Sequence, residues 1–127
     1  CDFFVVGEHA ATPYPERAGD LYQTWALDRA HRVWRLDVFR EPSDGDEWIC
    51  RRDQQIRLPY SQLIWHTTDG VPCLAPEVAL LFKAKWVRLK DEADLAATLP
   101  LLNGSQREWL RRALEITHPG HAWLGRL

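Results

Sequence analysis

LAPEVALLFKAKWVRLKDEAD, residues 74–94, is the stretch in which an apolar helix passes abruptly into a dense group of charges. Pro76 suits the first turn of a helix, because its missing N–H would have no partner there, and the glutamate that follows places a negative charge at the positive end of the helix dipole. Val78, Leu81 and Phe82 then recur at i, i+3 and i+4. Most other positions are also apolar, so we predict a helix that begins at Pro76 and is buried on most sides.

The charges that end this helix are four cations and two carboxylates: Lys83, Lys85, Arg88, Lys90, Asp91 and Asp94. The two aspartates are three positions apart and therefore share one face of a helix. Together these side chains could line a site for a polyanion. A structural explanation fits them as well, because Lys and Arg at the end of a buried helix reach out to water, and an aspartate after a lysine commonly caps the next helix. Composition and spacing alone favour the structural explanation and leave the polyanion site open.

The composition indicates a folded domain. The chain has 127 residues, of which 46% are hydrophobic, and its formal net charge is −2. This length supports a real core, and no apolar run approaches the roughly 20 residues that span a bilayer. A weakly negative chain has no general attraction to nucleic acid. We therefore expect a single domain over residues 1–127, with neither nucleic acid nor a membrane as a partner.

Three cysteines, Cys1, Cys50 and Cys73, are odd in number and widely separated. They suggest neither a disulfide framework nor a zinc knuckle, so a reducing, cytoplasmic location fits best. The start of the chain lacks the pattern of a signal peptide. Because the chain begins at Cys1 and contains no Met, we expect it to be a portion of a longer protein.

The clearest strand covers residues 31–40, where Trp34, Leu36 and Val38 fall on one face at period two. Asp37 should then point to the opposite face, together with Val33, Arg35 and Phe39. A strand presents a carboxylate into a cleft in this way. An ion pair between Asp37 and Arg51 or Arg52 explains the same pattern without any function, and the sequence leaves the two explanations equal.

Further elements are expected on both sides of this strand. Residues 3–6 should form a short buried strand, residues 8–20 a loop, and residues 21–30 extended structure. Turn residues at 41–46 should make a hairpin in which residues 47–51 return as the antiparallel partner. Asp44 and Asp46 have the spacing of a metal pair, but a solvated turn is the favoured interpretation. Short strands should follow at 56–58, 63–66 and 71–74, with a turn at 68–70.

Two more helices are expected after the central one. One opens at Lys90 or Asp91 and ends near Pro100, and the other follows a capping box over residues 105–108. The apolar stripe of the last helix comprises Trp109, Leu110, Ala113, Leu114 and Thr117. His118 and His121 are separated by Pro119-Gly120, which disfavours a metal site on a helix face. The expected fold class is α+β: a small mixed or antiparallel sheet, β-rich over residues 1–74, followed by helices over residues 75–127.

Several segments resemble one family in order and spacing. They are WRLDVF at residues 34–39, DEWICRRD at 46–53, GVP at 70–72, LAPE at 74–77 continuing to KAK at 83–85, and KDEAD at 90–94. The chain resembles the bacterial nucleotidyltransferase-fold proteins that are similar to aminoglycoside 2''-adenylyltransferase. The KDEAD element also looks like one in the abortive-infection toxin nucleotidyltransferases. The resemblance runs across most of the chain, and it implies a nucleotidyltransferase-like fold.

The resemblance also implies a chemistry. In that fold a Gly-rich turn precedes an Asp-x-Asp pair, a third acid comes from a later strand, and Mg²⁺ held by the acids clamps ATP. Asp37 matches the third acid, which implies a role as metal ligand or as general base for a substrate hydroxyl. Nothing before Asp37 matches the turn or the pair. The chain therefore looks like the C-terminal portion of such an enzyme and is expected to be inactive alone.

The expected function of the parent protein is transfer of a nucleoside monophosphate, most simply AMP from ATP, to a hydroxyl of a small molecule such as an aminoglycoside. The candidate nucleotide-binding residues are Lys83, Lys85, Arg88, Lys90, Asp91 and Asp94. The aromatic residues could pack on a base or sugar. The alternative is a non-catalytic binding or interaction domain, or a partner of the toxin–antitoxin type, that retains the fold.

Overall fold

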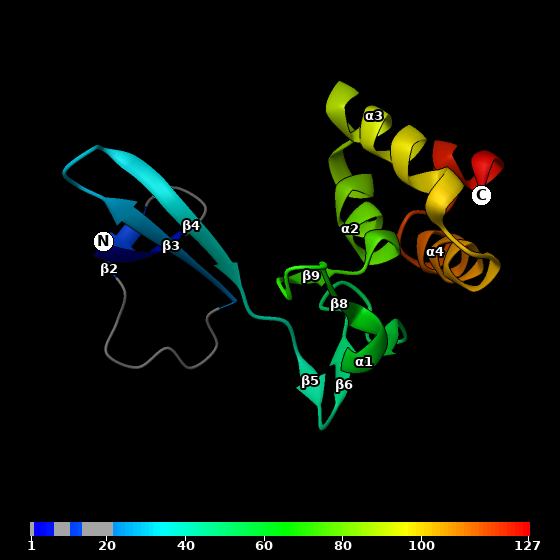
Figure 1. Cartoon of the computed structure of the whole chain (residues 1–127), viewed down its shortest axis with the longest axis horizontal. Helices are drawn as coiled ribbons and strands as arrows, with labels where there is room; N and C mark the ends of the chain where they lie inside the picture. Colours follow the sequence, from blue (N-terminus) through cyan, green and yellow to red (C-terminus); the bar gives the residue numbers. More distant parts are fainter. Residues whose placement is uncertain (1, 7–10, 14–21) are drawn as a thin grey trace. The chain divides into compact units, whose positions relative to one another are not determined.

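The computed structural model describes residues 2–6, 11–13 and 22–127. Small antiparallel sheets come first along the chain and helices follow, so the fold class is α+β, as predicted (Figure 1). The chain divides into two compact units, residues 1–42 and 43–127. The strands of residues 43–74 thus belong with the helices and not with the first sheet.

The first unit contains a four-stranded antiparallel sheet. Its strands are β1 (Asp2–Val6), β2 (Ala11–Pro13), β3 (Gln23–Asp28) and β4 (Val33–Phe39), in the order β2-β1-β3-β4. The strand expected at 3–6 is confirmed, and the extended segment expected at 21–30 is confirmed over β3, although residues 29 and 30 form a turn and residue 21 falls outside the described residues. The loop expected over 8–20 is wrong where β2 lies, because Ala11–Pro13 pairs with β1. The rest of that expected loop falls outside the described residues.

A β-bulge changes which side chains share a face of this sheet. Ala26 is opposite Leu36, but Leu27 is opposite Trp34, so Arg35 is an extra residue on β4. A bulge of this kind interrupts the alternation of side chains along the strand. The period-two pattern predicted from residues 33–39 therefore fails at this point.

The bulge relocates both Val33 and Trp34. Val33, opposite Asp28, lies on the face of Leu36, so its predicted place on the face of Asp37 is wrong. Phe4 is opposite Trp25, and Trp25 is opposite Asp37, so these three side chains lie on one face. The ring of Trp34 packs edge-on against Phe4 at 5.6 Å and against Trp25 at 5.3 Å, centroid to centroid. Trp34 thus lies on the face of Asp37, and its predicted place on the opposite face is wrong. The expected burial of the first strand is also wrong at Phe3, which is 53% exposed.

The second unit begins with a three-stranded sheet of β5 (Ser43–Asp44), β6 (Glu47–Ile49) and β7 (Arg57–Pro59). The partners of β6 are β5 and β7, so the predicted hairpin between residues 31–40 and 47–51 is wrong. Gly45 explains the difference, because its positive φ of 56° allows a tight two-residue turn between Asp44 and Glu47. The strand β6 therefore pairs with its neighbour in the chain, Ser43–Asp44.

A second hairpin leads to the helices. The short helix α1 (Tyr60–Leu63) precedes β8 (Ile64–His66), which pairs with β9 (Pro72–Leu74). The predicted turn at 68–70 is confirmed, since Gly70 has a φ of 78° and its N–H donates to the Thr67 carbonyl. The helix α1 was not predicted, and Leu63, which was predicted to lie in a strand, ends the helix as a buried residue.

The helical part starts at Pro76, as predicted. It comprises α2 (Pro76–Lys83), the 3-10 turn η1 (Ala84–Trp86), α3 (Leu89–Thr98), η2 (Leu99–Leu101), α4 (Gly104–Thr117) and η3 (Ala122–Arg126) (Figure 1). The capping box of α4 is formed by Asn103 and Gln106, which exchange backbone and side-chain hydrogen bonds, and not by residues 105–108. Asn103 takes this role because its backbone is extended while the next residue is already helical.

Leucines of three helices form the centre of the core of the second unit. Leu80 and Leu81 of α2 pack with Leu95 of α3 and with Leu110 and Leu114 of α4, and each is at least 98% buried. Burial of this many large apolar side chains is the main force that holds the helices together. Within the part of the chain that the structure describes, no helix is long and apolar enough to cross a membrane.

Candidate functional site

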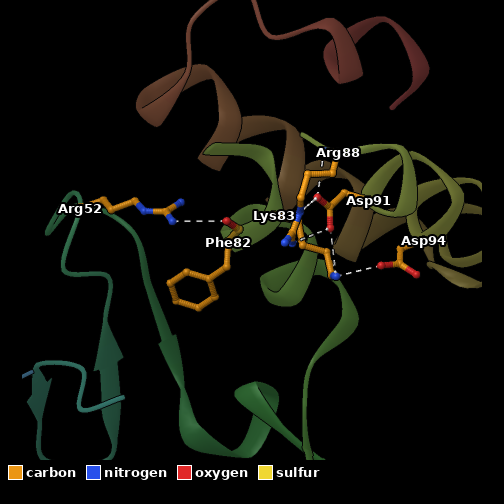
Figure 2. Close-up of polar contacts among 6 residues, drawn as sticks. All are labelled: Arg52, Phe82, Lys83, Arg88, Asp91 and Asp94. Atoms are coloured by element: carbon orange, nitrogen blue, oxygen red, sulfur yellow. Dashed lines mark hydrogen bonds and ion pairs between the residues drawn. The ribbon is translucent and has the colours of Figure 1, made fainter. Parts of the chain in front are cut away.

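Four of the six charged residues predicted as a polyanion site meet where α2 leads into α3: Lys83, Arg88, Asp91 and Asp94 (Figure 2). The Lys83 ammonium, at the end of α2, donates to Asp94 Oδ2 at 2.8 Å and to Asp91 Oδ1 at 3.3 Å. Both aspartates come from α3, one turn apart. Lys83 thus ties the two helices together, and these two carboxylates raise its pKa.

Asp91 is the centre of this cluster and its side chain is fully buried. Its Oδ2 accepts from the backbone N–H of Arg88 at 2.9 Å and from Arg88 Nε at 2.8 Å, so Asp91 caps the start of α3. The hydrogen bonds from Arg88, more than any other contact, hold the pKa of Asp91 far below its usual range. The structural explanation given above for an aspartate after a lysine therefore describes Asp91 well.

The C-terminal end of α2 is covered by Arg52, a side chain that was not predicted to lie there. Arg52 donates to the carbonyls of Leu81 at 3.1 Å and Phe82 at 3.3 Å, and its guanidinium lies 5.3 Å from the centre of the Phe82 ring (Figure 2). A cation at a helix C-terminus is favoured by the helix dipole. Arg52 is 29 positions from Leu81 in the chain, so no local sequence pattern could have placed it.

His121 reaches the adjacent 3-10 turn. Its Nδ1 accepts from the Trp123 backbone N–H at 3.1 Å, so its Nε2 carries the proton and donates to the Ala84 carbonyl at 3.1 Å. His118 lies beside it, with 6.0 Å between the ring centres. His121 thus binds the first carbonyl of η1, and His118 is the residue that follows the last turn of α4.

Lys85 and Lys90 differ from the paired cations. Both are exposed, and neither forms a hydrogen bond or ion pair with any residue that the structure describes. Between them in the chain, Trp86 is 78% exposed and Leu89 is 91% exposed. We call residues 85–90 the α2–α3 tip. It offers two uncompensated positive charges and an accessible aromatic ring, a combination that suits a phosphate-bearing aromatic ligand.

Asp37, the predicted catalytic and metal-binding residue, lies on β4 in the first unit and is exposed. Its two carboxylate oxygens accept from Gln23 Nε2 at 2.9 and 3.0 Å. Within the first unit, the partner of Asp37 is therefore a neutral amide. The ion pair with Arg51 or Arg52 stays a prediction, because both arginines belong to the second unit. The sequence contains no local signal for Gln23, because only the pairing of β3 with β4 brings it near.

The acids near Asp37 do not fit a two-metal site by themselves. Mg²⁺ requires several oxygen ligands in octahedral geometry, and Asp37 supplies one carboxylate that already accepts from an amide. Across residues 2–6, 11–13 and 22–127, no three His, Cys, Asp or Glu residues gather closely enough to hold a metal ion. Asp37 itself is one exposed carboxylate, oriented by Gln23.

Comparison with known proteins gives no neighbour. No protein-family model matches the sequence, no curated protein is significantly similar to it, and no solved structure matches it significantly.

Proposed function

We propose that this chain is the C-terminal portion of a Mg²⁺-dependent nucleotidyltransferase with a nucleotidyltransferase-like fold. Its parent transfers a nucleoside monophosphate, most simply AMP from ATP, to a hydroxyl of a small molecule such as an aminoglycoside. The sequence resemblance over residues 34–94 motivates the proposal. The α+β architecture, with the strand of Asp37 before the helix of Lys83, is compatible with it.

The α2–α3 tip is the observation that carries this proposal. Lys83 and Arg88 form ion pairs with Asp91 and Asp94. These ion pairs hold the backbone of the tip in place. Lys85 and Lys90 are then the cations free to contact phosphate, and Trp86 is free to stack on a base. Lys83, Arg88, Asp91 and Asp94 accordingly position the nucleotide contacts rather than make them.

Asp37 supplies the chemistry in this proposal. An exposed carboxylate that accepts hydrogen bonds from one amide retains lone pairs for a metal ion or for the proton of an acceptor hydroxyl. In this proposal the acid pair comes from another part of the parent enzyme. Bound Mg²⁺ would stabilise charge on the transferred phosphoryl group, and this chain would contribute the orientation of one ligand.

Nucleotide binding can be tested on the chain as it is. In a titration with Mg²⁺-ATP followed by ¹⁵N NMR, we expect weak, millimolar binding that shifts the Trp86 indole signal. Lys85→Gln with Lys90→Gln should remove this shift, whereas Arg32→Gln, which removes an exposed cation from the turn between β3 and β4, should not. Equal shifts in all three proteins would show that the tip is not the phosphate contact.

Catalysis is tested in a longer chain that carries the Gly-rich turn and the acid pair. Asp37→Asn should reduce transfer of labelled AMP from ATP to a panel of aminoglycosides by roughly 10² to 10⁴ while the fold is kept. The isolated chain should transfer none, because one carboxylate does not hold the metal ions. Robust transfer by the isolated chain would show that other acids, such as Asp44 and Asp46, form the pair.

A second candidate function is a non-catalytic binding or interaction domain, including a partner of the toxin–antitoxin type. The observation in its favour is the exposed apolar surface on one face of β4, where Val33, Leu36 and Val38 are 40%, 59% and 43% exposed. Exposed apolar groups that share one face of a strand are typical of surfaces that contact another protein. Full transfer activity of Asp37→Asn in the longer chain would favour this second function.

A further inference from the structure

A cavity of about 480 Å³ lies in the second unit, along α4 and against the turn that leads into β7. This volume is within the range of small-molecule sites. It is formed without Asp37 and without any residue of the α2–α3 tip. Its wall is one face of α4, where Ser105, Trp109, Arg112 and Ile116 recur at i+3 and i+4 spacing.

The lining of this cavity is apolar at its base. Ile56 and Ala113 are buried, at 4% and 3% exposure, while Ile116 keeps 41% of its surface exposed. Trp109 packs partly against the core, and part of its side chain faces the cavity. An apolar or aromatic ligand body could therefore replace water on Trp109 and Ile116.

Two guanidinium groups give the cavity its polarity. Arg57 is held in place, because its Nε donates to the Gln54 carbonyl at 2.9 Å and its Nη1 donates to Glu47 at 3.2 Å, which leaves Nη2 free of these contacts. Arg112 has no hydrogen bond or ion pair with any residue in the described part of the chain. The one acid of the lining, Glu108, is 3.7 Å from Arg111, outside the lining.

We propose that this cavity binds a small amphipathic organic anion, with its aromatic or apolar body on Trp109 and Ile116 and its anionic group between Arg57 and Arg112. Guanidinium groups bind carboxylate, sulfonate and phosphate oxygens through paired N–H donors. The orientation of Arg57 by Glu47 and Gln54 prepares one side of the anion site. Arg112 supplies the second side and the uncompensated charge.

The test uses 1-naphthalenesulfonate as the probe, with neutral 1-naphthalenesulfonamide as its match in shape, and follows ¹⁵N NMR signals of the chain. We expect saturable shifts of the Trp109 indole and of α4 backbone signals with the sulfonate. Arg112→Gln should weaken this binding about tenfold or more, as loss of a charge-assisted hydrogen bond does. Ile116→Ser, which removes an exposed apolar group, should weaken the sulfonate and the sulfonamide together.

Arg32→Gln is the matched control, because it removes an exposed cation outside the cavity and outside the α2–α3 tip. It should leave probe binding unchanged. Equal affinity for sulfonate and sulfonamide, unchanged binding in Arg112→Gln, or no saturable shift on α4 would each overturn the proposal. ATP binding at the tip depends on other residues, so either site can fail without the other.

Discussion

The two units of the molecule use their carboxylates in opposite ways. In the second unit, Asp91 is fully buried and is held by Arg88, Lys83 and a backbone N–H. In the first unit, Asp37 is exposed and is held by the neutral amide of Gln23. A buried carboxylate needs its partners in order to stay ionised, so its charge is committed to the fold. The charge of an exposed carboxylate remains available for chemistry.

The apolar side chains of the two units differ in the same sense. Leu81, Leu110 and Leu114 are completely buried in the second unit, whereas Leu36 and Phe39 on β4 are more than half exposed. The core of the second unit is therefore closed to solvent, and substitutions within it should lower the free energy of unfolding strongly. Substitutions on β4 should change the free energy of unfolding little, so they can report on function.

The largest effect is expected for Leu81→Ala in the closed core. Loss of a fully buried leucine side chain, with the cavity it leaves, should lower the free energy of unfolding by about 2 to 5 kcal/mol. Urea denaturation followed by tryptophan fluorescence measures this loss. The matched control is Leu101→Ala, since Leu101 is 81% exposed and should cost about 0.5 kcal/mol or less. A loss below half a kilocalorie for Leu81→Ala would mean that α2 buries a different face.

A smaller effect is expected for Asp91→Asn. The pKa of Asp91 is lowered in the folded chain, chiefly by Arg88, so its ionisation stabilises the fold above the unfolded pKa of about 3.9. That contribution is lost as the pH falls below this value. At pH 7 the melting temperature of Asp91→Asn should be lower by several degrees, and its decline below pH 4 should be shallower than that of the original chain.

Asp94→Asn is the comparison that sharpens this result. Asp94 is about half exposed and accepts one hydrogen bond from Lys83, so its replacement should change the melting temperature much less. If the two variants melt together, Asp91 does not cap α3 in solution. The cluster would then be a surface ion pair, and the proposal that it positions the tip would lose its basis.

A weaker pH dependence should come from His118. Burial, followed by the nearby charges of Arg52, His121 and Lys85, lowers the pKa of His118 in the folded chain. The unfolded chain then binds a proton first as the pH falls through about 6.5, so protonation favours unfolding. Between pH 8 and pH 5.5 the melting temperature of the original chain should fall more than that of His118→Gln. Parallel curves for the two proteins would show that His118 does not couple to folding in this range.

Local patterns predicted α2, α3 and α4, because helix-start residues and the spacing of Val78 and Leu81 operate within a few positions. The helix α1 was not predicted, and β2 and β5 were predicted as loop and turn. Gly45 allows a local hairpin in which β6 pairs with β5 and not with β4. The extra residue Arg35 places Trp34 on the face of Asp37. A turn and a bulge are each set by one residue, and their effect on pairing depends on distant strands.

The candidate site shows the same limit. Lys83, Asp91 and Asp94 could be grouped from the sequence, because one helix end and one helix start hold them within twelve positions. Gln23 and Arg52 could not, since each reaches its partner through tertiary packing. The cavity along α4 was also missed, because its stripe of mixed Arg, Trp and Ile looks like an ordinary exposed helix face until the turn of residues 55–57 covers it.

The smallest effect on stability is expected for Asp37→Asn in the isolated chain. Asparagine has nearly the same shape, and its carbonyl oxygen still accepts from Gln23, so the free energy of unfolding should change by about 0.5 kcal/mol or less. Gln23→Ala is the companion variant, and its effect should be equally small because both side chains lie on an exposed part of the sheet. Urea denaturation of both variants provides the measurement. A loss of more than about 1 kcal/mol for Asp37→Asn would show that the charge of Asp37 belongs to the fold, as that of Asp91 does. In that case a loss of transfer in the longer chain would reflect unfolding, and the nucleotidyltransferase proposal would lose the one catalytic residue that this chain supplies.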